Sequence, residues 1–320
     1  MSTTELYAAV TTGDGKAHVC TFDVDLETWG SFQPVSSLNL SGRKNVSVCI
    51  DNAVHIAATD DSPASELLLT ARTATGWTSA VKIASGVALA RAQKGSSTTA
   101  MRLLGLGAPT APDRAFGLPV FFAEPGGTVT RAGDASTYLD PGDLDPDDLP
   151  AAFDFGGNLD LGRSQPLLVL ASEAGGAYVA TLPKSGREKL TDLKSEAGDP
   201  GSVIHVACST EHVCVVSATG KIWHTYQRAG AWLPFGDVCA ATRSTETFRQ
   251  VAILETTEYG GSRRRLHLLG VTAGGGLFHT SRTLDDSPDP LWLPFTNVKA
   301  AAGDPGAIQF TDLAGNNVPD

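Results

Sequence analysis

The chain has 320 residues, of which 42% are hydrophobic and 18% are charged. Its formal net charge of -11 argues against DNA or RNA as a partner, because phosphate binding needs a basic surface. No apolar stretch approaches the roughly 20 residues needed to span a bilayer, and Met1 to Val10 lack the basic and apolar regions of a signal peptide. We therefore expect no membrane insertion, and a protein that is cytoplasmic or released without a classical signal peptide.

The first predicted strands lie at residues 6–10, 17–22 and 29–35, where apolar and polar residues alternate around the turn Gly13-Asp14-Gly15. Trp29 marks the end of this first segment, and Trp77 opens a similar segment 48 residues later. The spacing indicates a repeating unit of about fifty residues.

Residues 99–198 carry this repeat most faintly and contain an acidic segment. Asp143, Asp145, Asp147 and Asp154, within residues 140–154, mimic positions 1, 3, 5 and 12 of a calcium-binding loop. Aspartate stands where that loop needs glycine, and the last ligand is not glutamate, which favours a solvated loop. A calcium site is the alternative.

Residues 202–242 show one unit most clearly. Alternation and turn residues predict strands over 203–208, 213–216, 222–227 and 232–238. Four short strands joined by tight turns are typical of one antiparallel propeller blade, which must pack against copies of itself because it cannot bury both faces alone. No helical periodicity is present.

The C-terminal part repeats phrases from this unit. Trp232-Leu233-Pro234-Phe235 returns 60 residues later as Trp292-Leu293-Pro294-Phe295, and the phrase Ala-Gly-Asp-Pro-Gly at 197–201 returns 105 residues later at 302–306. Residues 307–311 then align with the first strand of a unit, while the N-terminal segment lacks a first strand. We therefore expect the C-terminal strand to pair with the N-terminal strands and to close a ring.

Together these patterns predict one all-β domain over residues 1–320, a β-propeller of four-stranded antiparallel blades. Six blades fit the period best, and seven shorter blades are the alternative. The predicted units are residues 307–315 with 1–37, 44–88, 99–157, 158–198, 202–242 and 245–301.

Motifs of known chemistry are absent from the sequence. There is no nucleophile elbow, phosphate-binding loop, zinc-protease helix or dinucleotide fingerprint, so we expect no enzyme, no catalytic residue, no cofactor and no metal. The cysteines lie in apolar strands without Cys-x-x-Cys spacing, which predicts five buried free thiols at 20, 49, 208, 214 and 239. Cys208 and Cys214 flank one predicted hairpin, and a bridge between them is the alternative.

Aromatic and polar residues recur together in the last two units. They are Trp223, His224, Gln227, Arg228 and Trp232 in the fifth unit, and His279, Arg282 and Trp292 in the sixth. The phrase from Ile222 to Gln227, followed by Trp232, resembles the blade motif of bacterial fucose-binding propeller lectins of the PLL-like kind, and tachylectin-type propellers are a more distant likeness. The resemblance implies a sugar-binding protein with pockets between blades and these eight residues as ligand-binding candidates.

The chemistry of these residue types suits a sugar, because an aromatic ring stacks on the C–H face of a sugar while polar groups pair its hydroxyls. The alternative for Trp232 and Trp292 is packing between blades. Trp223 and His224 are adjacent in one strand and should point to opposite faces. The expected partner is a glycan, with a fucose-containing one as the candidate.

Two other functions are compatible with the sequence. One is a protein-interaction scaffold that uses residues 134–160 and 285–290 as contact loops, since loops on a rigid ring carry recognition. The other is a metal-dependent hydrolase or lactonase, which ranks last because no set of acidic residues recurs on the inner strands.

Overall fold

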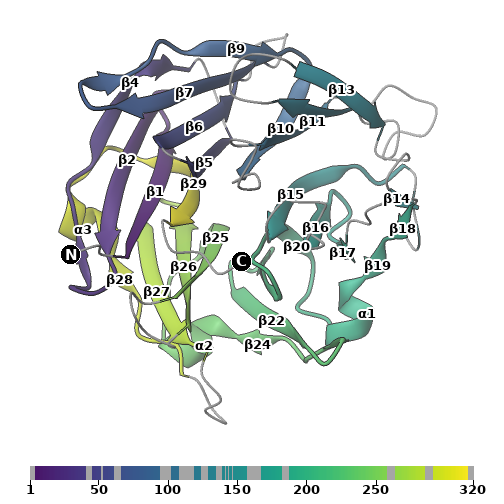
Figure 1. Ribbon diagram of the computed structural model, residues 1–320. Coiled ribbons are helices and arrows are strands. Elements are labelled where there is room, and N and C mark those ends of the chain that lie inside the picture. The colour runs from purple at the N-terminus through teal and green to yellow at the C-terminus, as the bar shows by residue number, and fades with distance from the viewer. Residues whose placement is uncertain are drawn as a thin grey trace.

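The computed structural model describes residues 4–315 apart from 41–44, 52, 61–65, 94–101, 108–118, 124–128, 135–138, 141, 143, 146, 157–166, 182–186, 258–263 and 285–290. Within these residues the chain forms six sheets of four or five strands, one two-stranded pair and three five-residue helices. The sheets are arranged around a common centre (Figure 1), and we number them 1 to 6 in chain order. The all-β propeller class predicted from the sequence is confirmed. None of the helices in the described ranges has the length and apolar character needed to cross a membrane.

Sheets 1 to 3 contain the N-terminal strands, and sheet 1 also takes in the last strand of the chain. Sheet 1 consists of β29 (Ile308–Gly315), β1 (Glu5–Thr12), β2 (Lys16–Asp23), β3 (Thr28–Trp29) and β4 (Gln33–Asn39). Sheet 2 consists of β5 (Val46–Asp51), β6 (Ala53–Thr59), β7 (Leu67–Thr73), β8 (Gly76–Trp77) and β9 (Val81–Ala84). Sheet 3 consists of β10 (Val87–Gln93), β11 (Arg102–Gly107), β12 (Pro119–Ala123) and β13 (Val129–Asp134).

Sheets 4 to 6 are each followed by a short helix. Sheet 4 consists of β15 (Pro150–Gly156), β16 (Leu167–Ser172), β17 (Ala177–Thr181) and β19 (Thr191–Asp192), then α1 (Leu193–Ala197). Sheet 5 consists of β20 (Val203–Cys208), β21 (His212–Ser217), β22 (Ile222–Arg228), β23 (Ala231–Trp232) and β24 (Gly236–Asp237), then α2 (Val238–Thr242). Sheet 6 consists of β25 (Phe248–Thr257), β26 (Arg264–Thr272), β27 (Leu277–Thr283) and β28 (Thr296–Asn297), then α3 (Val298–Ala302). The separate parallel pair is β14 (Leu139–Asp140) with β18 (Glu188–Lys189).

The two ends of the chain meet in sheet 1. Strand β29 pairs antiparallel with β1, with Thr311 opposite Val10 and Leu313 opposite Ala8. The innermost strands of neighbouring sheets also contact one another around the ring, in the order β29, β5, β10, β15, β20, β25 and back to β29. The predicted pairing of the C-terminal strand with the N-terminal strands is confirmed, and it gives β1 a partner on each edge, β29 on one and β2 on the other.

The predicted boundary between the third and fourth units was wrong. Residues 150–156 were assigned to the end of the third unit, but β15 pairs with β16 and forms the innermost strand of sheet 4. Phe153 and Phe155 of this strand are buried, which is what an inner strand covered on both faces requires. The boundary at residue 88 also shifts slightly, because β10 begins sheet 3 at Val87.

A glycine turn repeats between the second and third strands of four sheets. Gly15, Gly175, Gly220 and Gly275 have φ values of 80°, 87°, 79° and 78°, a conformation that glycine adopts without steric cost. Three of these turns also accept a hydrogen bond from the next sheet: Val203 N–H donates to Gly175 O, Phe248 N–H to Gly220 O, and Ile308 N–H to Gly275 O, at 2.8–3.1 Å. The turn therefore fixes both the hairpin and the position of the neighbouring sheet.

Three short helices occupy places where the sequence predicted strand or turn. Asp192, Asp237 and Asn297 cap the N-termini of α1, α2 and α3, each accepting a bond from a backbone N–H of the first turn. The prediction that the fourth strand runs to Val238 was therefore wrong, because the chain turns into α2 at that residue. A single helical turn is too short to produce a periodic pattern, which is why the sequence did not reveal it.

The repeated phrase Ala-Gly-Asp-Pro-Gly leads from a helix to the next inner strand. Gly198 and Gly303 end α1 and α3 with φ of 91°. In each copy the following aspartate accepts the N–H of the second glycine, at 2.9 Å, and pairs with a helix lysine, Lys194 or Lys299. The most informative repeat in the sequence is thus a connection between sheets.

The Trp-x-x-Phe motif joins sheets 5 and 1 to the helix that precedes each of them in the ring. Phe235 N–H donates to Ala197 O at the end of α1, and Phe32 N–H donates to Ala302 O at the end of α3. The aromatic rings of both motifs pack on the hydrophobic clusters between sheets 4 and 5 and between sheets 6 and 1. The motif therefore has a structural role in the contact between sheets.

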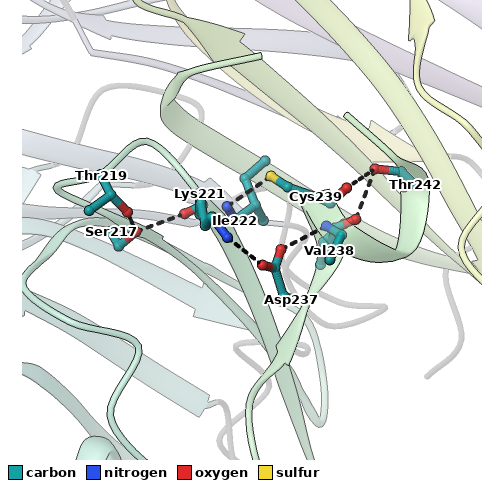
Figure 2. Close-up of polar contacts among 9 residues, drawn as sticks. Ser217, Thr219, Lys221, Ile222, Asp237, Val238, Cys239 and Thr242 are labelled. Atoms are coloured by element: carbon teal, nitrogen blue, oxygen red, sulfur yellow. Dashed lines mark hydrogen bonds and ion pairs between the residues drawn. The ribbon is translucent and has the colours of Figure 1, made fainter. Parts of the chain in front are cut away.

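The cap of α2 gives a direct test of these connections. The Asp237 carboxylate accepts Ala240 N–H at 2.8 Å and pairs with Lys221 Nζ at 2.9 Å. Figure 2 shows the pair of Asp237 with Lys221 and the hydrogen bond that Cys239 Sγ accepts from Ile222 N–H. We expect Asp237→Ala to lower the free energy of unfolding by about 1 kcal/mol, because it removes the cap. Urea denaturation measures this change.

The control is Lys221→Met, which removes the exposed ion pair but keeps the cap. Exposed ion pairs contribute little, so this variant should change the free energy of unfolding by less than about 0.5 kcal/mol. Equal losses in both variants would show that the ion pair matters more than the cap.

Candidate functional site

One position beside the recurring tryptophan differs from sheet to sheet. In the antiparallel register, Trp29 pairs with Phe22, Trp77 with Arg72, Trp232 with Gln227 and Trp292 with Arg282. Each of these tryptophans packs on the cluster shared with the preceding sheet. The paired side chain therefore lies at the boundary between two sheets, where its identity sets the chemistry of that boundary.

Seven of the eight residues predicted from the sequence are distributed over three boundaries. Trp223 and Trp232 pack on the cluster between sheets 4 and 5, and Gln227 pairs with Trp232 there. His224, Arg282 and Trp292 meet between sheets 5 and 6. His279 lies between sheets 6 and 1. Arg228 is exposed at the end of β22.

Trp223 and His224 do point to opposite faces of β22, as the sequence predicted. Trp223 contacts the cluster of sheets 4 and 5, with Lys221 Nζ 5.9 Å from the centre of its ring. His224 instead contacts Trp292 of sheet 6, with ring centres 5.4 Å apart in an edge-to-face arrangement. The two side chains therefore cannot belong to one pocket.

The boundary between sheets 5 and 6, which we call the 5/6 niche, consists of His212, His224, Tyr226, Arg282 and Trp292. His212 Nδ1 lies 3.0 Å from His224 Nε2, and the two imidazoles are stacked. Arg282 Nη1 lies 3.2 Å from His224 Nδ1. The guanidinium carbon is 5.5 Å from the centre of the Trp292 ring and 5.8 Å from that of Tyr226. Cation–π contacts of this kind stabilise a cation between two aromatic rings.

The electrostatics of the 5/6 niche follow from burial. Burial, together with the positive charges of Arg282 and Arg264, lowers the pKa of His212 to about 3, and burial holds the pKa of His224 well below its ordinary value. Both imidazoles are therefore neutral at pH 7. Burial also lowers the pKa of Arg282 from its usual value, because it removes water from the cation.

A pocket of about 640 Å³ lies between sheets 6 and 1, and we call it the 6/1 pocket. Its walls include Phe22, Trp29 and His279, whose rings contact one another with centres 4.7–5.4 Å apart. Arg265 of sheet 6 and Glu27 of sheet 1 also line it, and their side chains form an ion pair of 2.9 Å across the boundary. The pocket thus presents aromatic faces, a hydrogen-bond acceptor and hydrogen-bond donors together.

Two local features set the geometry of the 6/1 pocket. Glu27 has φ of 53°, a left-handed conformation that is uncommon outside glycine and often occurs at functional sites. His279 Nε2 lies 3.2 Å from His267 Nδ1, so a second buried histidine holds its ring in place. Burial and then Arg265 lower the pKa of His279 to about 3, which keeps the pocket wall uncharged at neutral pH.

A third polar boundary lies between sheets 1 and 2 and contains Glu5, Tyr7, Arg72 and Trp77. The Tyr7 hydroxyl donates to Glu5 Oε2 at 2.9 Å. Burial and this hydrogen bond raise the pKa of Tyr7 to about 12, while the charge of Arg72 acts in the opposite direction. Arg72 is exposed and Trp77 is half-buried, so both are accessible to a ligand.

Sequence reasoning missed most of the residues in these boundaries. Trp29 and Trp77 served only as markers of the repeat, and their partners Phe22 and Arg72 were not singled out. A signal was present, because Arg72 precedes Trp77 by five residues, as Gln227 precedes Trp232. Glu27 and Arg265 carried no such signal, since they meet only through the packing of sheet 6 on sheet 1.

The acidic segment between 140 and 154 divides into separate parts. Asp154 is buried in β15 and accepts the backbone N–H groups of Phe155 and Cys208. Asp145 accepts Asp147 N–H, and Asp143 lies outside the described residues. Across the described ranges, no group of three or more His, Cys, Asp or Glu side chains is placed to hold a metal ion. The five cysteines are buried thiols, as predicted, and Cys208 and Cys214 do not form a bridge.

Comparisons with known proteins identify the fold but no family. No model of a protein family matches the chain, and no curated protein matches it. The similar solved structures include AofleA from Arthrobotrys oligospora, with a TM-score of 0.58, 12% identity, and coverage of 97% of this chain and 88% of that one.

Two of the other similar structures are lectins. The Aleuria aurantia lectin, described as a six-bladed β-propeller with a novel fucose recognition mode, has a TM-score of 0.53 and 13% identity, with 95% of this chain and 99% of that chain covered. The SapL1 lectin, in complex with α-methyl fucoside, has a TM-score of 0.51 and 10% identity, with 93% and 96% covered. At these identities the likeness defines the chain as a β-propeller and goes no further.

Proposed function

We propose that this chain is a non-catalytic carbohydrate-binding propeller of six blades, with a sugar pocket between sheets 6 and 1. The observation that supports it most is the 6/1 pocket itself, which combines the rings of Phe22 and Trp29 with the Glu27–Arg265 pair. Its volume is within the usual range for small-molecule sites, about 300–1,000 Å³.

Each part of the pocket has a role in this proposal. The aromatic rings offer apolar faces for the C–H groups of a sugar. Glu27 accepts hydrogen bonds and Arg265 donates them, so the pair suits hydroxyl groups, which do both. Fucose is the first sugar to test, because two structures of the same fold are described as fucose-recognising or fucoside-bound. The finer resemblance to PLL-like lectins belongs to this same proposal.

We expect Glu27→Gln to weaken binding of the sugar by about tenfold or more, because hydrogen bonds to charged groups contribute about 1.5–3 kcal/mol. A glycan array first identifies the sugar, with α-methyl fucoside included as a free ligand, and calorimetric titration then compares the wild type with the variant. Glu27 is exposed, so the substitution should leave the thermal unfolding temperature unchanged.

The matched control is Asp14→Asn, which also neutralises an exposed, ion-paired carboxylate of sheet 1 but lies in the turn between β1 and β2. This variant should bind the sugar as the wild type does. Unchanged affinity in Glu27→Gln would place the sugar elsewhere, and the absence of binding to any glycan would contradict the proposal as a whole.

A protein-interaction scaffold is the second candidate, and exposed apolar side chains favour it. Leu26, Leu291 and Leu293 are 70%, 78% and 48% exposed, in sheets 1 and 6 or the turns beside them. Leu291 directly follows the predicted contact loop at 285–290, which lies outside the described residues. A Leu291→Ser variant that binds glycans normally but loses a co-purifying protein would support this second function.

A further inference from the structure

Arg282 is the cation of the 5/6 niche, and it has no anionic partner. The neighbouring arginines are paired, Arg264 with Glu255 and Arg265 with Glu27. Within the described part of the chain, no carboxylate forms an ion pair with Arg282, whose contacts are His224 and the rings of Tyr226 and Trp292. A half-buried cation whose direct contacts are all neutral groups has lost water without gaining a counter-charge.

The hydrogen bonds of the niche fix how Arg282 is held. Arginine can only donate, so His224 Nδ1 must accept the bond from Nη1. The proton of neutral His224 is therefore on Nε2, which donates to His212 Nδ1. The pair of histidines thus acts as an acceptor chain that orients the guanidinium, and it does so without adding negative charge.

The remaining donors of Arg282 are not used by the protein. Nε is enclosed and has no hydrogen-bond partner among the described residues. Nη2 also makes no hydrogen bond to the described residues. Unlike Nε, Nη2 is not enclosed by protein atoms, so a ligand can reach this end of the guanidinium. The Tyr226 hydroxyl is similarly unbonded and not enclosed, on the ring that stacks on this guanidinium.

The other boundaries lack this arrangement. The position of Arg282 is taken by Gln227 between sheets 4 and 5 and by Phe22 between sheets 6 and 1. Arg72 occupies it between sheets 1 and 2, but there Glu5 and Tyr7 lie on the neighbouring sheet, so a carboxylate is present. Only the 5/6 niche, of these four, offers a cation with neutral neighbours.

We propose that the 5/6 niche binds the anionic group of an acidic sugar, with Arg282 as the residue that contacts the carboxylate or sulfate and Tyr226 as a partner for an adjacent hydroxyl. A ligand anion would supply the counter-charge that the protein lacks, and charge-assisted hydrogen bonds to arginine are among the stronger polar contacts. The choice of a sugar rests on the proposed function, whereas the choice of an anion rests on Arg282 alone.

Calorimetric titration of the full chain with matched sugars tests this inference. The probes are methyl β-D-glucuronide, its neutral counterpart methyl β-D-glucoside, and glucose 6-sulfate. We expect the wild type to bind the glucuronide at least about tenfold more tightly than the glucoside, with an affinity that falls as salt is added, because salt screens charge. The sulfate probe shows whether the niche distinguishes a sulfate from a carboxylate. If glucose 6-sulfate binds as tightly as the glucuronide, the niche recognises charge alone. If glucose 6-sulfate binds more weakly, the niche selects carboxylates.

Arg282→Gln should reduce the preference for the glucuronide to less than about twofold. Glutamine occupies the equivalent position in sheet 5, so the fold should tolerate it. If that variant does not fold, Arg282→Lys keeps the charge and should retain a weaker preference. The control is Asp14→Asn in the turn between β1 and β2, which lies outside both proposed sites and should keep the preference for the glucuronide.

The outcomes separate this inference from the proposed function. If neutral glycans bind in a Glu27-dependent way and the glucuronide binds no better than the glucoside, the anion site is wrong and the sugar pocket stands. If the preference exists but persists in Arg282→Gln, the anion binds elsewhere and the inference is again wrong. If only acidic sugars bind, and Arg282 is required, the 5/6 niche stands while the 6/1 pocket does not.

Discussion

Deleting the closing strand β29 is expected to abolish cooperative folding of the chain. This strand pairs with β1 and also joins two neighbouring sheets, since Asp312 accepts Ser47 Oγ and Val48 N–H of sheet 2 at 2.7 and 2.9 Å. Gln250 of sheet 6 exchanges hydrogen bonds with the backbone of Thr311. A chain that stops at Pro305 loses all of these contacts and exposes the edge of β1, which invites aggregation.

Circular dichroism and urea denaturation measure the effect, and the matched control is a chain that stops at Gly315. That control retains the whole of β29 and should unfold in one cooperative transition, as the full chain does. A cooperative transition in the chain that stops at Pro305, with a similar midpoint, would mean that the ring does not depend on its closing strand.

Acidification is expected to produce the second large loss of stability, between about pH 6.5 and pH 3. His212 and His279 have pKa values near 3 in the folded state, mainly because of burial, and those of His224 and His267 are also lowered. In the unfolded chain histidine takes up its proton at about pH 6.5. Below that pH the unfolded state binds more protons than the folded state, so stability falls as the pH falls.

The magnitude is large because four histidines act together. His212 and His279 each contribute about 1.4 kcal/mol per pH unit between pH 6.5 and pH 4, or about 7 kcal/mol together, and His224 and His267 act in the same direction. This loss is comparable to the stability of about 5–15 kcal/mol that is usual for a protein. Urea titrations at several pH values measure the slope. Stability that is constant from pH 7 to pH 4 would contradict the buried, neutral state of these rings.

The double variant His267→Leu with His279→Val separates the histidines from the carboxylates, which also titrate in acid. Leu167 and Val179 occupy the equivalent places in sheet 4, so the substitution copies a pair that the fold already uses. Its stability should fall less steeply with acid than that of the wild type. A slope equal to that of the wild type would assign the acid sensitivity to other groups.

The parts of the fold that repeat in the sequence could be predicted from it. The turn residues, the Trp-x-x-Phe motif and the strand at 307–311 recur along the chain, and together they predicted the propeller class and the pairing of β29 with β1. The unit boundary at residues 150–156 could not be predicted, because β15 contains no repeated phrase and its role is set by its pairing with β16. The helices were missed because each is one turn long.

The candidate site was predictable only in part. Single residues such as His224 and Arg282 were visible, because they recur beside tryptophan. In the structure His224 and Arg282 meet, whereas His279 belongs to a different boundary. This arrangement depends on which face of its strand each residue occupies and on which sheet packs against that face. The Glu27–Arg265 pair joins residues 238 positions apart, and no local pattern encodes a contact of that kind.

The Trp-x-x-Phe motif holds neighbouring sheets together through backbone atoms, with Phe32 and Phe235 donating their N–H groups to Ala302 and Ala197. The residue opposite the tryptophan takes no part in this backbone contact, and it differs from sheet to sheet: Phe22, Arg72, Gln227 and Arg282. A propeller built in this way is free to diverge into a set of unlike receptors on one frame. If both proposed sites bind their ligands, such a molecule would cross-link two chemically different ligands, whereas a ring of identical sites would only gather copies of one.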